Sequence, residues 1–159
     1  MNSLQMLKLS TLFQGWKESD LQTLASACQT KDLSAGESLF VQGEEAFSFF
    51  IVGSGTLVIR KMTSGDDESV SSLGAGSVIG EMAMLVAAGA PPDKRFAGAE
   101  AKEFSTVVEI PLEAFDKILA DHPNLGMLFY KNLGITMAAR IRRTTEDFAG
   151  LKSLRLRHV

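Results

Sequence analysis

Residues 80–101, GEMAMLVAAGAPPDKRFAGAEA, begin with a glycine and a carboxylate and then run through small apolar residues, broken by prolines, to a single arginine. A carboxylate accepts hydrogen bonds and a guanidinium pairs with anions, so Glu81 and Arg95 together could hold a small molecule between them. Each residue taken alone is also consistent with an ordinary charged group on the surface. Their joint placement favours a binding site.

Residues that could form a catalytic set are scarce. Of the two histidines, His122 precedes a proline at a helix junction and His158 stands near the end of the chain. Neither lies at metal-ligand spacing with the other or with Cys28, and no Ser/His/Asp or Cys/His arrangement has local support. An acidic tip at residues 66–68 is more typical of a solvated turn than of a metal site. We therefore expect no enzyme, no metal and no cofactor.

The composition is that of a globular protein with a sizeable core. A chain of 159 residues with 45% hydrophobic and 22% charged residues predicts one domain over residues 1–159. The single cysteine, Cys28, excludes an internal disulfide, fits a reducing compartment and is best explained as a small core residue. The first residues resemble neither a signal peptide nor a membrane span, so we expect a cytoplasmic protein without membrane association.

Three zones would position the charged residues. Residues up to about 28 read as helix, with a capping-box pattern at Ser19 and Gln22. Residues 31–111 consist of short β-type runs between glycines, typical of a barrel or sandwich. In this zone FFIVGSGTLVI and RKMTSGDDESV each predict a hairpin. Residues 112–151 predict a short helix that stops before Pro123 and then a long helix, followed by a loose basic tail at 152–159.

The long helix carries a possible pairing seam. Residues spaced alternately four and three apart form a heptad pattern: Tyr130, Gly134, Met137, Ile141, Thr144, Phe148 and Leu151. We favour a helix that pairs with a second copy over one that packs only on its own barrel. From Lys131 onward the chain also has a local excess of positive charge, although its net charge is −3. This excess fits either a solvated helix face or a docking surface for an acidic partner or nucleic acid.

The order of these zones resembles the cyclic nucleotide-binding domain family, which includes the catabolite activator proteins, the regulatory subunits of cyclic-nucleotide kinases and gated channels. The resemblance covers about residues 11–150 and rests on LFQGWKESDLQTLA, GESLFVQGEEAFSFFIVGSGTLVI, SSLGAGSVIGEMAML and VVEIPLEAFDKILADHPNL. It implies an α+β fold: a β roll, similar to a double-stranded jelly roll, flanked by an N-terminal helix and by C-terminal helices that include one long helix.

The resemblance also implies a binding site for a cyclic nucleotide. By position, Glu81 would accept the ribose 2′-hydroxyl, and Arg95 would pair with the phosphate beside a short helix that starts at a tight turn. Ala83 and Ala97 would let the backbone approach the ligand, and hydroxyl groups of the long helix would contact the base across a dimer. The expected set is Gly80, Glu81, Met82, Ala83, Arg95, Phe96, Ala97, Thr144 and Thr145. The two threonines could equally be ordinary helix residues.

Two departures from the family pattern affect this stretch. VAAGAPPDK makes the loop longer, and we expect AAGAPPDK to form a mobile surface flap. Phe96 stands where a small residue is expected. If its ring faced the phosphate, it would displace hydrogen-bonding partners of the anion, whereas a ring pointing into the barrel would leave the pocket intact.

These features favour a stand-alone cyclic nucleotide sensor, with cAMP as the favoured ligand, that acts through movement of its last helix. We expect a homodimer formed through the long helix and a protein partner of unknown identity. The activator proteins continue into a winged-helix DNA reader, and the few residues after Leu151 cannot form one, so direct DNA binding is not expected. The alternative is a domain of the same fold that binds no nucleotide and serves as a dimeric scaffold.

Overall fold

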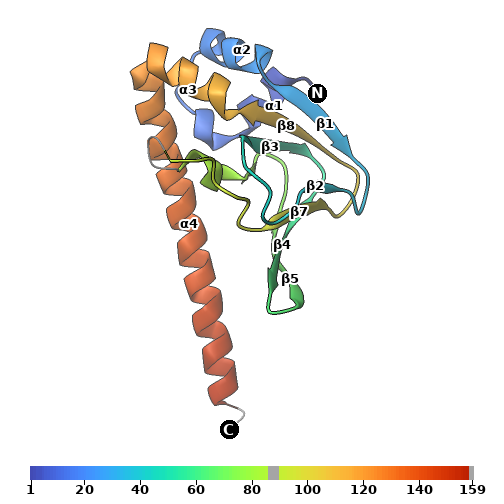
Figure 1. Cartoon of the computed structure of the whole chain (residues 1–159). Helices are drawn as coiled ribbons and strands as arrows, with labels where there is room; N and C mark the ends of the chain where they lie inside the picture. The colour runs from blue at the N-terminus through green and yellow to red at the C-terminus, as the bar shows by residue number, and fades with distance from the viewer. Residues whose placement is uncertain (86–89, 158–159) are drawn as a thin grey trace.

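Two antiparallel sheets form a β roll, and helices lie at one end and along one side of it (Figure 1). The computed structural model describes residues 1–85 and 90–157. One sheet has the strand order β1-β8-β3-β6 and the other β2-β7-β4-β5. The strands are β1 Gln29–Leu33, β2 Ser38–Phe40, β3 Ser48–Ser54, β4 Leu57–Thr63, β5 Asp66–Leu73, β6 Val78–Ile79, β7 Gly98–Ala101 and β8 Ser105–Pro111. The expected α+β class with a β roll is confirmed.

Only one of the two predicted hairpins forms. β4 pairs with β5 from Leu57 opposite Leu73 to Thr63 opposite Asp66, which confirms the second hairpin. The first is wrong because β3 pairs with β6 and β8, and so belongs to the other sheet from β4. The Gly-Ser-Gly segment is therefore a crossing between sheets. It needs glycine because Gly55 has a φ of 80° and a Cβ there would collide with Ser105.

The N-terminal zone contains more helix than expected. Helix α1 Ser3–Leu9, the 3₁₀ turn η1 Thr11–Phe13 and helix α2 Glu18–Ser26 follow one another. The capping box belongs to α1, where the side chains of Asn2 and Gln5 bond each other's backbone N–H groups. The predicted capping box at Ser19 is wrong, because α2 begins at Glu18 and its N-cap residue is Lys17. Ser19 therefore lies inside the helix, where its carbonyl accepts a hydrogen bond from the Thr23 hydroxyl.

Two clusters of buried side chains hold the fold together. One lies beneath the helices and includes Phe49, Phe115 and Phe129, with ring centroids of neighbouring pairs 4.7–6.0 Å apart. The other fills the β roll and includes Phe40 and Phe50. The second cluster also includes Ile79, Ala99 and Ala101, so it contains residues within and next to the stretch that was predicted to bind a ligand.

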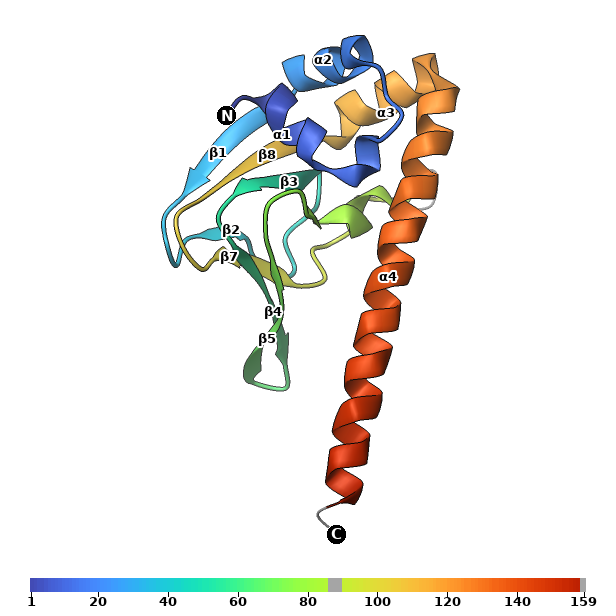
Figure 2. The ribbon, with the colours of Figure 1, turned by 180° about the vertical axis from the view of Figure 1, so that it is seen from behind.

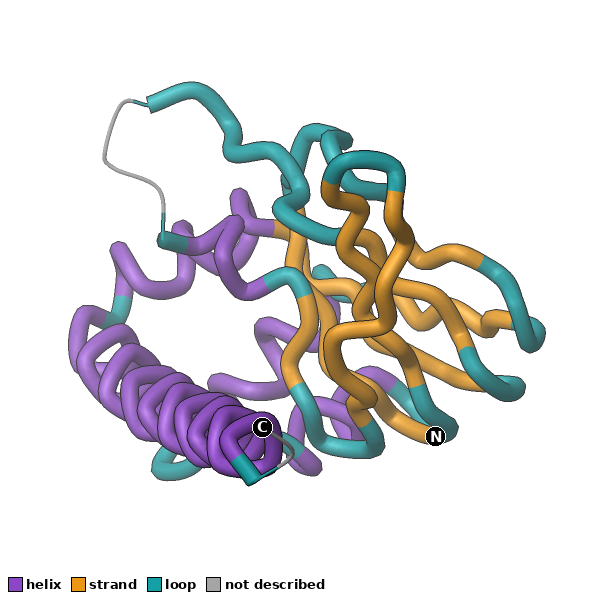
Figure 3. The backbone as a smooth tube through the Cα atoms, turned by 90° about the horizontal axis from the view of Figure 1, so that it is seen from below, coloured by secondary structure: helices purple, strands orange, loops and turns teal. Residues whose placement is uncertain are grey.

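The C-terminal zone is formed by helices α3 Leu112–Asp121 and α4 Pro123–Leu156. The helix α4 has 34 residues and continues through Leu156, into the segment expected to be a loose tail. Its buried residues all belong to its first part, from Leu125 to Leu133, and its remaining length runs alongside and past the β roll (Figures 2 and 3). None of the described helices is long and apolar enough to cross a membrane.

Candidate ligand-binding site

A pocket of about 560 Å³ opens between the β roll and α4. Its walls come from β2, β4, β5, the residues around Gly80, the segment before β7, and α4. The residues that α4 contributes are Arg140, Arg143, Thr144, Asp147, Phe148 and Leu151. The pocket is therefore bounded by two parts of the chain, the β roll and the helix, that are far apart in sequence.

Gly80 forms the tight turn that was expected at the start of this site. Its φ of 75° and ψ of 20° are left-handed, and it leads into the short 3₁₀ helix η2 Glu81–Met84. A Cβ at Gly80 would lie 2.6 Å from Arg95 Nη1, so glycine is required both by the backbone conformation and by the arginine beside it. The residue thus fixes where Arg95 can lie.

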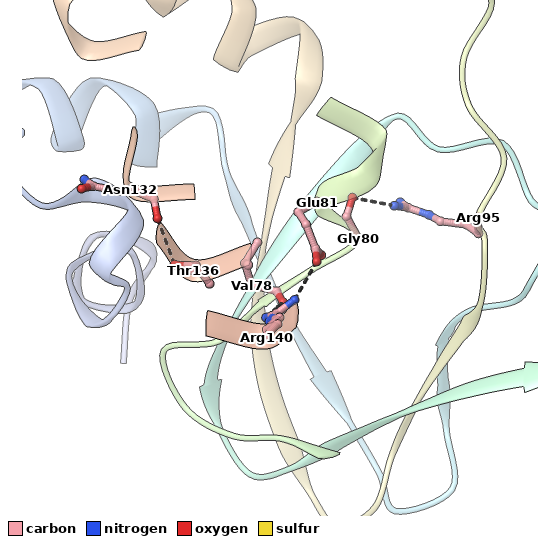
Figure 4. A network of polar contacts seen from close by, with 7 residues as sticks. All are labelled: Val78, Gly80, Glu81, Arg95, Asn132, Thr136 and Arg140. Carbon is pink, nitrogen blue, oxygen red and sulfur yellow. Dashed lines mark hydrogen bonds and ion pairs between the residues drawn. The ribbon is translucent and has the colours of Figure 1, made fainter. Parts of the chain in front are cut away.

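Arg95 is the charged group at the centre of the site. It is only 8% exposed, and its guanidinium lies over the ring of Phe40 at 4.3 Å and that of Phe50 at 5.6 Å. Its guanidinium forms two hydrogen bonds, both long at 3.5 Å. Nη1 donates to the Gly80 carbonyl (Figure 4), and Nη2 donates to Ser48 Oγ.

No described residue supplies Arg95 with a paired anion. Its Nε has no hydrogen-bond partner within the described part of the chain, and no carboxylate there forms an ion pair with it. Burial lowers the pKa of Arg95, and the attraction of Glu109 and Glu44 opposes that shift. Since an isolated buried charge is costly, the guanidinium is suited to an anion that enters from outside.

Glu81 has a partner that the sequence did not predict. Its Oε1 accepts a 2.6 Å hydrogen bond from Arg140 Nη1, and Arg140 Nη2 donates to the Val78 carbonyl at 2.9 Å (Figure 4). This ion pair joins the residues around η2 to the middle of α4. Arg140 lies one helical turn before Thr144, so the basic run that precedes the threonines was the available indication.

Phe96 points neither at the Arg95 guanidinium nor into the barrel. Its side chain is 60% exposed at the rim of the pocket, and Lys61 Nζ lies 3.8 Å from its ring centroid. Lys61 also donates to the Phe96 carbonyl at 2.6 Å. The bulky residue is therefore held outward, and Ala97 after it lines the pocket.

Part of the predicted flap lies outside the described residues, at 86–89. The end of the flap is paired with the backbone of residues 43–46. Ala46 N donates to the Asp93 carbonyl at 2.8 Å, and Arg95 N donates to the Glu44 carbonyl at 2.7 Å. This backbone pairing ties the end of the flap to residues 43–46 and positions Arg95, and the mobility of the flap stays a prediction.

The two threonines lie in different surroundings. Thr144 lines the pocket, and its hydroxyl donates to the Arg140 carbonyl at 3.0 Å. Thr145 donates to the Ile141 carbonyl at 2.8 Å and is not part of the pocket wall. The structure thus brings eight of the nine expected residues to one pocket, with Thr145 outside it: Gly80, Glu81, Met82, Ala83, Arg95, Phe96, Ala97 and Thr144.

Two further observations concern metal-binding and nucleophilic groups among the described residues. They include no group of three or more His, Cys, Asp or Glu side chains placed to hold a metal ion. Burial, with the nearby charge of Glu109, raises the pKa of Cys28 to about 12, so its thiol is not a nucleophile at neutral pH.

Comparison with known proteins assigns the chain to a family of ligand-binding regulatory modules. The sequence model of the cyclic nucleotide-binding domain matches residues 30–122. The chain belongs to this family, and the resemblance seen in the sequence is confirmed. A family described as a nucleotide-binding domain, with regulatory proteins among its relatives, makes this chain a binding module.

Two curated relatives illustrate the breadth of the family. The cAMP-dependent protein kinase regulatory subunit of Mycosarcoma maydis is 30% identical over 117 residues, covering 74% of this chain and 22% of the relative. The CRP-like cAMP-activated global transcriptional regulator of Mycobacterium tuberculosis is 25% identical over 148 residues, covering 92% and 62%. The chain thus spans less than two thirds of either relative.

Solved structures share the fold. A cyclic nucleotide-binding domain from Methylobacillus flagellatus superposes with a TM-score of 0.76 at 20% identity, covering 90% of this chain and 80% of that one. The Thermus thermophilus catabolite activator protein gives 0.70 at 24% identity, covering 90% and 63%. The regulatory domain of a Toxoplasma gondii kinase, crystallised with cAMP, gives 0.64 at 28% identity, covering 73% and 42%.

Proposed function

We propose that the pocket binds a cyclic nucleotide, with cAMP as the favoured ligand, and that the protein is a stand-alone sensor that responds through α4. The observation that carries this proposal is Arg95, a buried guanidinium at the pocket without an anionic partner among the described residues. Two similar proteins support cAMP: one relative is a cAMP-activated regulator, and one structural neighbour was crystallised with cAMP. A cytoplasmic location stays our expectation.

In this proposal Arg95 pairs with the cyclic phosphate, and the left-handed turn at Gly80 gives the ligand room beside η2. Glu81 accepts the ribose 2′-hydroxyl. Only its Oε1 is used by Arg140 in the described structure, so Oε2 can take the hydroxyl without breaking the ion pair. Ala83 and Ala97 allow close approach, and Thr144 contacts the base.

Met82 and Phe96 would form the rim of the ligand site, since both side chains are exposed where they line the pocket. Thr145 could contact a base only from a second copy of the chain, because it is not in the wall of its own pocket. Its role therefore depends on the homodimer that the sequence predicts.

The proposed response follows from the two walls of the pocket. A ligand that contacts Arg95 and Thr144 together touches the β roll and α4 at once. It therefore binds more tightly to the arrangement that brings the helix to the roll, and only such a difference in affinity can shift an equilibrium. The Glu81–Arg140 ion pair also joins the β roll to α4, so it would change when the helix moves relative to the roll.

Calorimetry and thermal unfolding with cAMP test the proposal. cAMP at 100 times its dissociation constant should add about 2.7 kcal/mol to the free energy of unfolding. Arg95→Gln should weaken binding by about 2 kcal/mol or more, because the phosphate loses its charged partner. Arg142→Gln is the matched control, because this exposed arginine of α4 does not line the pocket. Equal affinity of the Arg95 variant and the native protein would contradict the assignment.

A second candidate function is a dimeric scaffold that binds no nucleotide. The observation that favours it is the Glu81–Arg140 ion pair, which already occupies the carboxylate expected for the ribose. Under this alternative no cyclic nucleotide would raise the unfolding temperature, and Arg140→Gln would lower stability without any effect of ligand.

A further inference from the structure

A row of hydrogen-bonded polar side chains runs across three neighbouring strands, β1, β8 and β3, and ends at Arg95. Ser48, at the start of β3, accepts from Arg95 Nη2 at 3.5 Å and donates to Glu109 Oε1 of β8 at 2.7 Å. The other oxygen of that carboxylate, Oε2, lies 2.7 Å from Lys31 Nζ of β1. In the strand register Glu109 stands opposite Gln29 on one side and Phe50 on the other, so Lys31 and Ser48 are its diagonal neighbours two residues along.

The direction of these hydrogen bonds is fixed by chemistry. A guanidinium has only donors, so the single hydroxyl proton of Ser48 must go to the carboxylate. Both oxygens of Glu109 are therefore engaged, one by a hydroxyl and one by an ammonium group. Burial alone would raise the pKa of Glu109, but the bonds from Lys31 and Ser48 and the charges of Lys31 and Arg95 bring it below its ordinary value of 4.5. The carboxylate is ionised at neutral pH.

Only one hydroxyl group separates this carboxylate from Arg95, yet the two do not form an ion pair in the described structure. Ser48 is buried, at 6% exposure, and the Glu109 side chain is 23% exposed, so water screens the two charges only in part. A Glu109 side chain released from its present partners would have an unpaired guanidinium beside it. The internal carboxylate and an incoming anion would then compete for the same group.

We propose that Lys31 and Ser48 are positioning residues that hold the Glu109 carboxylate off Arg95, and so keep the guanidinium available to an anionic ligand. This inference rests on the proposed function and names the residues that set the affinity of its anion site. When Lys31 or Ser48 is removed, Glu109 pairs with Arg95 in some of the molecules. The apparent affinity is then the intrinsic affinity multiplied by the fraction of molecules whose Arg95 remains free.

Rescue by a second substitution tests the proposal with cAMP as the probe. Lys31→Met and Ser48→Ala should each weaken cAMP binding about tenfold, and Glu109→Gln alone should bind cAMP at least as tightly as the native protein. The double variants Lys31→Met/Glu109→Gln and Ser48→Ala/Glu109→Gln should recover to within about threefold of native affinity, because the competing carboxylate is gone. A merely structural role predicts double variants that are no better than the single ones.

Lys8→Met is the matched control, since Lys8 forms an exposed ion pair with Glu18, and neither residue bonds to Lys31, Ser48 or Glu109 in the described structure. Unfolding curves for every variant separate loss of fold from loss of affinity. Unchanged affinity in both single variants, or double variants as weak as the single ones, would overturn the inference while leaving the proposed function intact if the native protein binds cAMP.

A ligand-free measurement keeps the inference testable if the native protein binds no cAMP, the outcome that contradicts the proposed function itself. Nuclear magnetic resonance of the arginine side chains reports the exchange of the Arg95 Nε proton. That exchange should slow in Lys31→Met and Ser48→Ala and return to the native rate when Glu109→Gln is added. An Arg95 signal that is the same in all variants would refute the competition.

Discussion

Gly80 affects both the backbone conformation of the site and the position of its charged group, Arg95. Gly80→Ala should lose about 1–2 kcal/mol of stability from the left-handed backbone. It should also lose affinity for cAMP, because the added Cβ would lie 2.6 Å from Arg95 Nη1 and must displace it. Chemical unfolding and calorimetry on the same samples measure the two effects.

Gly36→Ala is the control for that experiment. Gly36 has a similar φ of 84°, but no atom lies within 4 Å of the position its Cβ would occupy. It should lose comparable stability and bind cAMP like the native protein. Equal affinity losses in both variants would mean that the strain alone, and not the position of Arg95, weakens the site.

The ionised form of Glu109 should contribute to stability in a pH-dependent way. Its pKa in the folded protein lies below the ordinary value of 4.5, so folding favours the charged form. The contribution is present above that value and is lost as the pH falls through the lowered pKa. Native protein and Glu109→Gln should therefore differ in urea unfolding at neutral pH and converge in acid. A difference that grows in acid would contradict the direction of the shift.

The resemblance to the family, more than local sequence, predicted that Gly80 and Arg95 would lie at one pocket, because the family pattern relates residues that are 15 apart in this chain. It could not reveal the partner of Glu81, since Arg140 lies 59 residues further along the chain. Nor could it show that Phe96 is turned outward, because the residue that holds its ring, Lys61, comes from a neighbouring strand. Contacts of this kind depend on the packing of the complete fold.

Among the elements, α4 is held to the β roll midway along its length by Arg140. Arg140→Gln should remove this ion pair and weaken the hold by roughly 0.5–1 kcal/mol, a modest value because the arginine is partly exposed. Hydrogen exchange of the α4 amides should become faster beyond residue 140, with little change near Phe129. Arg142→Gln, on the same helix, is the control and should leave the exchange rates unchanged.

The elements themselves were largely predictable where a single strand or helix determines its own pattern. The β4–β5 hairpin and the long helix followed from their residues. The Gly-Ser-Gly crossing did not, because a glycine turn looks the same whether the next strand returns beside the first or joins another sheet. β3 is buried along nearly its whole length, and that burial depends on two neighbours, β8 and β6, which lie elsewhere in the sequence.

The exposed apolar side chains of α4 motivate a prediction for the whole molecule. Ile141, Phe148 and Leu151 are more than 60% exposed, although the heptad pattern assigns them to a seam. We predict a modest parallel homodimer through this seam. Each large side chain buried there could contribute roughly 1.5–3 kcal/mol before the costs of association. Light scattering on the native chain and on Ile141→Asp/Phe148→Asp measures the mass.

A native protein that stays monomeric at high concentration would refute this dimer, and with it any base contact from Thr145 of a second copy. The seam and the pocket share Thr144, Phe148 and Leu151. A partner helix packed on these residues would therefore also close the open side of the pocket, and dimerisation should strengthen with ligand. Mass measurements with and without cAMP detect that coupling.

The length of α4 also has a mechanical consequence. Between its contact at Arg140 and its end at Leu156 the helix extends roughly 24 Å without buried residues. A stiff rod turning about a fixed pivot magnifies motion in proportion to its length. A tilt of about 10° at Arg140 would carry Leu156 through roughly 4 Å, about the width of a side chain. The far end of α4 would thus amplify a small shift at the pocket into a displacement large enough to change its contacts with a neighbouring molecule.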